Sequence, residues 1–294
     1  MTPIGSSVID AHLHLWDLDR RVSTPTTGAK KPYPWLTPAL GDLHRSHLPQ
    51  EARGVLDDMG GHRAIIVQAE DSPAETDLLL DWAEQHDWIL GVVGWLPLRD
   101  PAATAQALDD LAGRPLVGVR HLVHDDPDAG FLDDPNVRES LSIVAECGLP
   151  LDVPDAWPRH LEQLTVLALD LPDLVVVVDH LAKPPRAQGR DAMAAWAQGL
   201  AAAATLPNVV AKVSGLQCAG APLTTEALSG VLDLALALFG ADRLMYGSDW
   251  PMTTLHEQGP AHHWAAIRGW LDGRDPGEQR AVLSATAART YRLA

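Results

Sequence analysis

VIDAHLHLWD, residues Val8–Asp17, is the segment around which we expect the chain to be arranged, because it closes a short apolar run with two histidines. Alternate residues of a β-strand project from one face, so a strand here would place the side chains of His12 and His14 together. Two imidazoles held in this way can chelate a divalent ion or donate two hydrogen bonds to one oxygen atom. The pair also fits surface histidines or a satisfied polar cluster, so the rest of the chain must distinguish these interpretations.

A pattern of a short apolar run, a polar or proline-rich connection and a helical stretch recurs along the chain. Continuous apolar runs rich in β-branched residues are typical of strands that are buried on both faces of a parallel sheet. Eight such runs are present: Val8–His14, Arg63–Ala69, Ile89–Trp95, Leu116–His121, Leu149–Val153, Leu174–His180, Val209–Gly215 and Arg243–Asp249.

Helix-starting signals stand between these runs, such as Ser72-Pro73 followed by Glu75, which reads as a cap, a first-turn proline and a capping-box acid. Helices are expected over Pro73–His86, Pro101–Leu111, Pro135–Cys147, Pro158–Asp170, Gln188–Thr205, Pro222–Phe239 and Pro276–Arg289. Eight strands that alternate with helices over about 250 residues predict an α/β fold, the (β/α)8 TIM barrel. A doubly wound open sheet is the alternative, but no strand is followed by a GxGxxG or GxxxxGK motif.

We expect a single domain over residues 1–294, because no shift in composition marks a boundary. Leu18–Leu48 breaks the pattern, since it is rich in proline and polar residues and carries the aromatics Tyr33 and Trp35. Long loops inside compact domains are commonly functional, and this one follows the first strand on the catalytic side of a barrel. We therefore expect residues 18–48 to form a lid over the site, with a surface insertion as the alternative.

The composition limits the partners. A formal charge of −17 argues against nucleic acid or an anionic membrane surface, so we expect a small-molecule substrate. No apolar run is long enough for a membrane span, and the first residues lack a signal peptide, which predicts a cytoplasmic protein. Cys147 and Cys218 lie far apart, so we expect two buried apolar residues, neither a disulfide nor a cysteine zinc site. A homo-oligomer is left open.

Polar and ionisable side chains stand at the ends of the predicted strands. Barrel enzymes place their reactive groups there, and such residues are costly to bury unless they are paired or used. The strand ends supply His12, His14, Gln68, Glu70, Trp95, Arg120, His121, Asp152, His180, Lys212, Ser214 and Asp249. Three of these histidines, His12, His14 and His180, together with an arginine and a carboxylate at one rim, predict a catalytic site.

Asp249 is the strongest single candidate, because it lies in MYGSDWP at a tight turn after the last strand. A carboxylate there can ligate a hard cation or take a proton from water, although a loop cap is the alternative. His180 ends VVVVDH and fits a structural or a catalytic histidine equally well. Arg120 and His121 could orient a substrate carboxylate or hydroxyl, or form ion pairs with nearby acids.

The segments DAHLHLWD, KPYPWL, GVRH, VVDHLAKP, KVSGL and YGSDWP occur here in an order that resembles the amidohydrolase-related family of metal-dependent hydrolases. The resemblance covers the chain from Val8 to the last helix and is greatest to the sugar-lactonase branch, which contains L-fuconolactonases and L-rhamnonolactonase-like proteins. It implies a (β/α)8 barrel that hydrolyses a ring ester, with His12, His14 and Asp249 at the reaction centre and His180 beside them.

The resemblance also bears on the metal. Two-metal members have a bridging lysine on the fourth strand and a histidine on the fifth, where this chain has GVRH and LDVPDAW. A binuclear site is therefore not expected, and the missing fifth-strand histidine also counts against the zinc-dependent decarboxylases of the family. Two options stay open: one divalent ion, with zinc favoured, on His12, His14 and Asp249, or no metal at all.

We therefore expect a lactonase for a small sugar-derived or similar polar lactone, with Asp249 and His180 as catalytic residues. The residues expected to bind the substrate are Arg120, His121, Lys183, Tyr33, Trp35, Gln68 and Trp250. Hydrolysis of an amide or decarboxylation of a ring carboxylate by the same site is the first alternative. A non-catalytic barrel that binds a sugar acid is the second.

Overall fold

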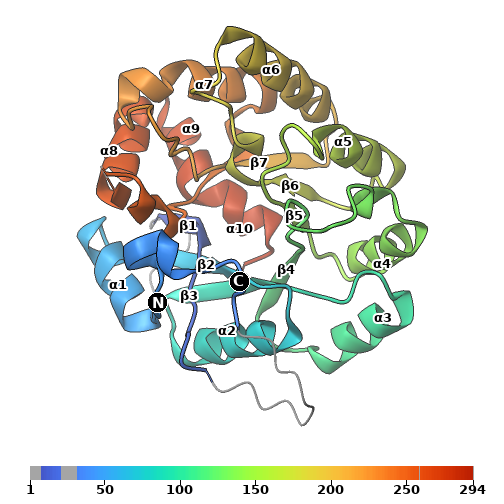
Figure 1. The fold of residues 1–294 in the computed structure, drawn as a ribbon. Helices are drawn as coiled ribbons and strands as arrows, with labels where there is room; N and C mark the ends of the chain where they lie inside the picture. Colours follow the sequence, from blue (N-terminus) through green and yellow to red (C-terminus); the bar gives the residue numbers. More distant parts are fainter. Residues whose placement is uncertain (1–7, 21–31, 258, 294) are drawn as a thin grey trace.

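Eight parallel strands form one sheet in chain order, in a computed structural model that describes residues 8–20, 32–257 and 259–293 (Figure 1). Each strand lies within one of the predicted runs, which confirms the (β/α)8 barrel. The strands are β1 (Ile9–Leu13), β2 (Arg63–Val67), β3 (Ile89–Gly94), β4 (Leu116–Arg120), β5 (Leu151–Val153), β6 (Val176–Val178), β7 (Val209–Val213) and β8 (Leu244–Tyr246). Because the strands end early, the polar residues predicted at strand ends mostly lie at the last position or just beyond it.

Helices surround the strands (Figure 1). They are α1 (Pro49–Asp58), α2 (Pro73–Gln85), α3 (Pro101–Asp110), α4 (Pro135–Glu146), α5 (Leu161–Asp170), α6 (Arg190–Ala204), α7 (Thr225–Phe239), α8 (Gly259–Leu271), α9 (Pro276–Arg280) and α10 (Thr286–Thr290). No helix in the described ranges is long and apolar enough to cross a membrane.

The helix predictions were incomplete in three places. Helices α1 and α8 were not predicted, because α1 starts without a side-chain cap and α8 starts at a glycine. The helix predicted over Pro276–Arg289 is interrupted by a π-helical segment, Ala281–Ala285. The capping box at α2 was wrong as well: Ser72 makes no cap hydrogen bond, and the Glu75 carboxylate instead accepts from the backbone N–H groups of the loop before it.

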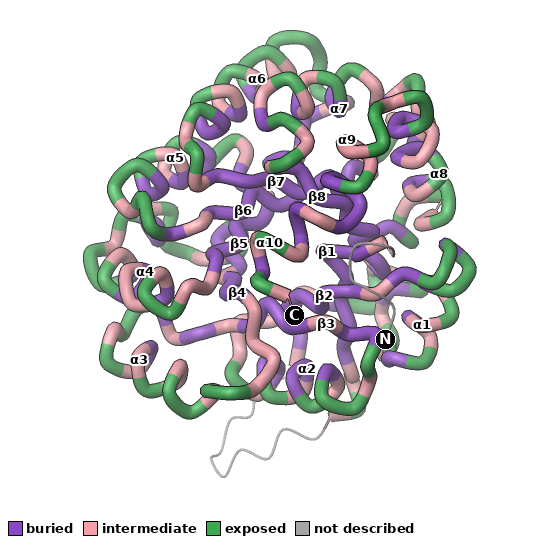
Figure 2. The backbone as a smooth tube through the Cα atoms, turned by 180° about the vertical axis from the view of Figure 1, so that it is seen from behind, coloured by how far each residue is buried: buried purple, intermediate pink, exposed green. Residues whose placement is uncertain are grey.

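One end of the barrel interior is apolar and is closed by the C-terminal helix. Side chains of alternate strand residues such as Ile9, Val67 and Met245 form one buried cluster, which also includes Tyr291 just after α10. Seen from behind, α10 lies in the middle of the ring of buried strands (Figure 2). A larger apolar cluster fills the space between the strands and the outer helices. The open end is therefore left for the site.

The barrel closes between β1 and β8 through the segment that follows β8. The backbone N–H of Asp249 donates to the His12 carbonyl at 2.8 Å, and that of His14 donates to the Trp250 carbonyl at 2.7 Å. The carboxylate oxygen Oδ1 of Asp10 accepts from the N–H groups of His12 and Ser248, at 3.1 and 2.8 Å. Closure of the barrel and placement of the predicted site residues thus share the same contacts.

The described part of the segment predicted as a lid packs against the start of the site. Tyr33, Leu36 and Leu43 form a buried cluster with Trp16 and Ala69. Residues 21–31 lie outside the described residues, so the lid remains a prediction. The prediction of two buried cysteines was wrong, because Cys147 at the end of α4 is exposed and Cys218 is partly exposed.

Candidate active site

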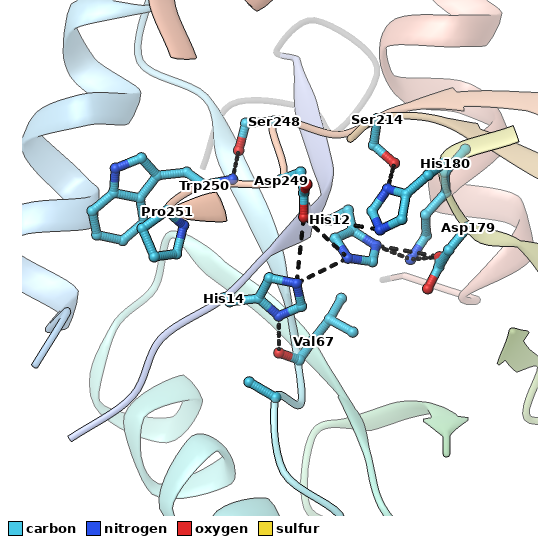
Figure 3. Close-up of polar contacts among 12 residues, drawn as sticks. His12, His14, Val67, Asp179, His180, Ser214, Ser248, Asp249, Trp250 and Pro251 are labelled. Carbon is cyan, nitrogen blue, oxygen red and sulfur yellow. Dashed lines mark hydrogen bonds and ion pairs between the residues drawn. The ribbon is translucent and has the colours of Figure 1, made fainter. Parts of the chain in front are cut away.

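Four predicted residues meet at the carboxyl ends of β1, β6 and β8 (Figure 3). The Nε2 atoms of His12 and His14 are 3.1 Å apart. Oδ1 of Asp249 lies 3.5 Å from Nε2 of His14, 3.8 Å from that of His12 and 3.9 Å from that of His180. All four residues are at most 5% exposed. The structure therefore brings together three imidazoles and one carboxylate around a single point.

The second ring nitrogen of each histidine has a partner away from this point. Nδ1 of His14 lies 2.8 Å from the Val67 carbonyl, and Nδ1 of His180 lies 2.9 Å from Oγ of Ser214. A carbonyl only accepts hydrogen bonds, so Nδ1 of His14 carries the proton and its Nε2 presents a lone pair to the centre. Partners of this kind fix the orientation of a ligating or catalytic imidazole.

The charges of the centre follow from its burial. Burial lowers the pKa of the imidazoles of His12, His14 and His180, which favours their neutral forms. Burial opposes ionisation of Asp249, but its interactions with His180 and His14 outweigh that cost and hold the pKa of the carboxyl well below its usual range. The centre thus favours an ionised carboxylate beside imidazoles whose burial disfavours protonation.

This donor set fits one divalent metal ion. A tetrahedral zinc ion with ligands at about 2.0–2.2 Å separates its donor atoms by about 3.3–3.6 Å, close to the 3.1, 3.5 and 3.8 Å among His12, His14 and Asp249. Neutral imidazole nitrogens and a carboxylate oxygen are ligands that zinc accepts. A second group in the described residues, His12, Asp179 and His180, also brings its ligand atoms within 4.8 Å of one another.

The backbone is strained where it presents the catalytic candidates. His180 through Lys183 have φ of 51 to 60°, and Asp249 has φ of 55°, all in the left-handed region. Each such residue costs roughly 1–2 kcal/mol unless the surroundings hold it. Gly215 permits the His180 conformation, because a Cβ there would stand 2.2 Å from Nδ1 of that histidine.

A pocket of about 290 Å³ opens over the centre. Trp16, Trp35 and Met252 form an apolar part of its wall, with the two indole rings 5.5 Å apart and nearly perpendicular. The other lining residues are His14, Ala69, Arg120, Leu122, His124, Asp125, Asp155, His180, Lys183 and Asp249. An amphipathic cavity of this size suits a small polar ring compound.

Three of the seven residues predicted to bind the substrate line this pocket, namely Arg120, Lys183 and Trp35. The Arg120 guanidinium, 4% exposed, donates to the Gln68 carbonyl and lies 3.3 Å from Oδ2 of Asp179. The Lys183 ammonium lies 3.8 Å from Oδ1 of Asp155. Both cations therefore already face a carboxylate.

The other four lie outside the described lining of the pocket. His121 stacks on Phe131 and lies 2.9 Å from the Asp126 carboxylate, as its alternative interpretation expected. Gln68 donates to the Arg120 carbonyl. Tyr33 and Trp250 are buried in apolar clusters beside the site. Their positions support the wall of the pocket rather than form it.

Asp155 and His124 line the pocket but were not predicted from the sequence. Asp155 follows β5 within LDVPDAW and His124 follows β4, so the same rule of strand ends would have found both had it been extended by a few residues. Asp179, directly before His180, was also overlooked and faces Nδ1 of His12 at 3.2 Å.

The chain is similar to known proteins over nearly its whole length. The family model described as amidohydrolase matches residues 9–293. The L-fucono-1,5-lactonase of Burkholderia ambifaria is 32% identical over 97% of this chain and 95% of its own length. A crystal structure of a Burkholderia multivorans amidohydrolase with bound HEPES has a TM-score of 0.86 and 30% identity, covering 98% of this chain and 100% of that one.

A second crystal structure of an amidohydrolase from Burkholderia multivorans, with bound zinc, has a TM-score of 0.84 and 30% identity over the same shares of the two chains. The family model spans nearly the whole barrel and includes every residue of the centre. The chain therefore belongs to the amidohydrolase family.

Proposed function

We propose that the protein is a lactonase that hydrolyses the ring ester of a small, neutral, sugar-derived or similar polar lactone. The observation that carries the proposal is the buried Asp249 carboxylate, whose Oδ1 lies 3.5 to 3.9 Å from Nε2 of three imidazoles at the floor of an amphipathic pocket. The L-fucono-1,5-lactonase, 32% identical over nearly the whole chain, supports a lactone as the substrate.

Asp249 acts as the general base in this proposal. Its carboxylate takes a proton from a water molecule as that water's oxygen adds to the lactone carbonyl. The carboxylic acid so formed then returns the proton to the ring oxygen as the ring carbon–oxygen bond breaks. The product is an open hydroxy acid, and Asp249 is again ionised.

The side chains of His180 and Arg120 are placed to stabilise the negative charge that develops on the carbonyl oxygen of the lactone. Nδ1 of His180 can accept from the Ser214 hydroxyl, which leaves Nε2–H of His180 to donate into the site. The Arg120 guanidinium brings a positive charge to the same region. Both side chains line the pocket.

A divalent metal ion is part of the proposal, and zinc suits the donor set best. His12, His14 and Asp249 would hold it. When bound, the ion would supply Lewis acidity and make water a better nucleophile at neutral pH. The zinc reported in the Burkholderia multivorans structure supports this choice of ion.

The charges around the pocket favour a neutral substrate over the alternatives. Among the described lining residues, Arg120 and Lys183 already face Asp179 and Asp155, so neither is left unpaired for a substrate carboxylate. Decarboxylation of a ring carboxylate therefore has less support than opening of a neutral ring. Trp16 and Trp35 offer aromatic faces for the C–H side of such a ring.

The test is proton release by the purified protein on a panel of aldonolactones, corrected for spontaneous hydrolysis, with amides followed by ammonia release and hydroxylated aromatic acids by CO2 release. We expect turnover of a few lactones and none of the amides or acids. Parallel assays with a chelator, followed by return of zinc, test the metal. Silence on every lactone, with folded and zinc-supplied protein, would contradict the proposal, and saturable binding without turnover would favour the non-catalytic barrel.

A further inference from the structure

Lys212 is a buried cation that the proposed chemistry does not use. It lies on β7 and is 0% exposed. Its Nζ is 2.5 Å from Oδ2 of Asp152, 3.1 Å from Oδ1 of Asp179 and 3.1 Å from Nδ1 of His12. Three elements of the barrel thus direct two carboxylate oxygens and one imidazole nitrogen at one ammonium group.

These contacts resemble the coordination of a metal ion. His12, Asp179 and His180 form the second group of described residues whose ligand atoms lie close enough to hold a metal. Nζ of Lys212 lies 3.1 Å both from Nδ1 of His12 and from Oδ1 of Asp179, two residues of that group. The ammonium therefore stands where a second cation would bind.

The charge balance of this region depends on Lys212. Asp152 and Asp179 are both fully buried, and an unpaired buried carboxylate is strongly destabilising. Arg120 faces the other oxygen of Asp179, so Lys212 and Arg120 together balance the two acids. The hydroxyl of Tyr291, just after α10 at the closed end of the barrel, also donates to Asp152 and holds that carboxylate in place.

We propose that Lys212 is a positioning residue, a tethered internal cation that holds the His12 ring in place and excludes a second metal ion. Its ammonium holds Oδ1 of Asp179, at 3.1 Å, and that oxygen lies 3.2 Å from Nδ1 of His12. With a metal ion on Nε2, Nδ1 carries the proton and faces this carboxylate, so that Nε2 points at Asp249 and His14. The site keeps room for one metal ion, on the Nε2 side. This assignment rests on the proposed function only for its activity readout.

Lys212→Ala is the direct test, because it removes the ammonium and leaves a cavity with the shape of the removed part of the side chain. Loss of a group that orients a ligand commonly costs about 10- to 100-fold in activity or metal affinity, and we expect lactone turnover to fall by that factor. Methylammonium chloride should restore part of the turnover and raise the melting temperature, whereas the bulkier tetramethylammonium chloride should do neither. In wild type both salts should act alike.

Metal content gives a readout that needs no lactone. After equilibration with zinc, Lys212→Ala should bind one more ion per chain than wild type, on His12, Asp152 and Asp179. Methylammonium should compete with that ion. Wild-type turnover and wild-type metal content in this variant, without an amine effect, would overturn the proposal. If no lactone is turned over but the metal and amine effects are seen, the proposed function fails and the role of Lys212 stands.

Two further variants keep the test decisive if Lys212→Ala does not fold. Lys212→Met combined with Asp152→Asn removes one charge of each sign and fills the space, so we expect folded protein with low turnover and no response to methylammonium. Arg243→Met is the matched control, since the described acceptors of Arg243 are backbone carbonyls, such as those of Ala204 and Val209. It should lower the melting temperature without changing metal content or amine response. Full turnover in the double variant would contradict the proposal.

Discussion

Asp249 is the residue on which the proposed reaction depends. Asp249→Asn keeps the shape of the side chain but removes its ability to take a proton from water, so we expect turnover to fall by about 10²- to 10⁴-fold. Circular dichroism and the melting temperature should stay close to those of wild type, because Gln217 can still donate to the remaining amide oxygen. Near-normal turnover in this variant would remove Asp249 from the mechanism.

Glu75 lies outside the active site, and we expect it to make the stability of the protein depend on pH. The carboxyl is fully buried, and burial raises its pKa to about 8, from an ordinary value of 4.5. Between these two values the unfolded chain releases the proton while the folded chain retains it, so the contribution of Glu75 to stability is lost as the pH rises from 4.5 to 8.

Glu75→Gln should remove this pH dependence, because a neutral amide can still accept from the N–H groups of Ala69 and Glu70. We expect its melting temperature to rise relative to that of wild type as the pH increases from 4.5 to 8. Thermal unfolding of both proteins at intervals across this range checks the prediction. Parallel curves would show that Glu75 ionises normally in the folded protein.

At the level of elements, the loops after β6 and β7 must pass close to each other to present His180. Gly215→Ala would place a methyl group 2.2 Å from Nδ1 of His180, on a backbone whose φ is 56°. We expect the ring to be displaced and turnover to fall at least about tenfold. Gly220→Ala is the control, because it shares a positive φ of 78° but has nothing within 4 Å of the added carbon.

Equal loss of turnover in these two variants would mean that backbone strain alone, and not the position of His180, explains the effect. Stability measurements on both separate the strain that they share from the clash that only Gly215→Ala has.

Strand periodicity and strand-end chemistry could be predicted from the sequence, because both are local. The apolar runs bury on both faces, and that requirement located β1 to β8. The placement of reactive groups at strand ends, together with the family resemblance, then pointed to His12, His14, His180 and Asp249. Helix α1 was missed because its N-cap residue, Leu48, has no polar side chain, and helix α8 because it begins at a glycine, so tertiary packing is needed to reveal them. The contact between Lys212 and His12 joins residues 200 positions apart, and no local pattern contains it.

On the scale of the whole molecule, the seam between β1 and β8 links stability to catalysis. Asp10 is fully buried, and its Oδ1 accepts from the backbone N–H groups of His12 and Ser248, one on each side of the seam. Asp10→Ala would leave both N–H groups buried without an acceptor, at about 1–3 kcal/mol each. Because the same groups neighbour the catalytic candidates, the loss should appear in turnover as well as in the free energy of unfolding.

Asp10→Asn tests whether the hydrogen bonds or the charge matter at this seam. The amide oxygen of Asn can accept from both N–H groups, so we expect this variant to stay close to wild type while Asp10→Ala loses stability and turnover together. Denaturant unfolding and lactone assays on the two variants give the comparison. If Asp10→Ala unfolds like wild type, the barrel does not depend on this side chain for closure. If it is destabilised but keeps full turnover, then closure and catalysis are separable, and the backbone bonds from Asp249 to His12 and from His14 to Trp250 hold the centre without Asp10.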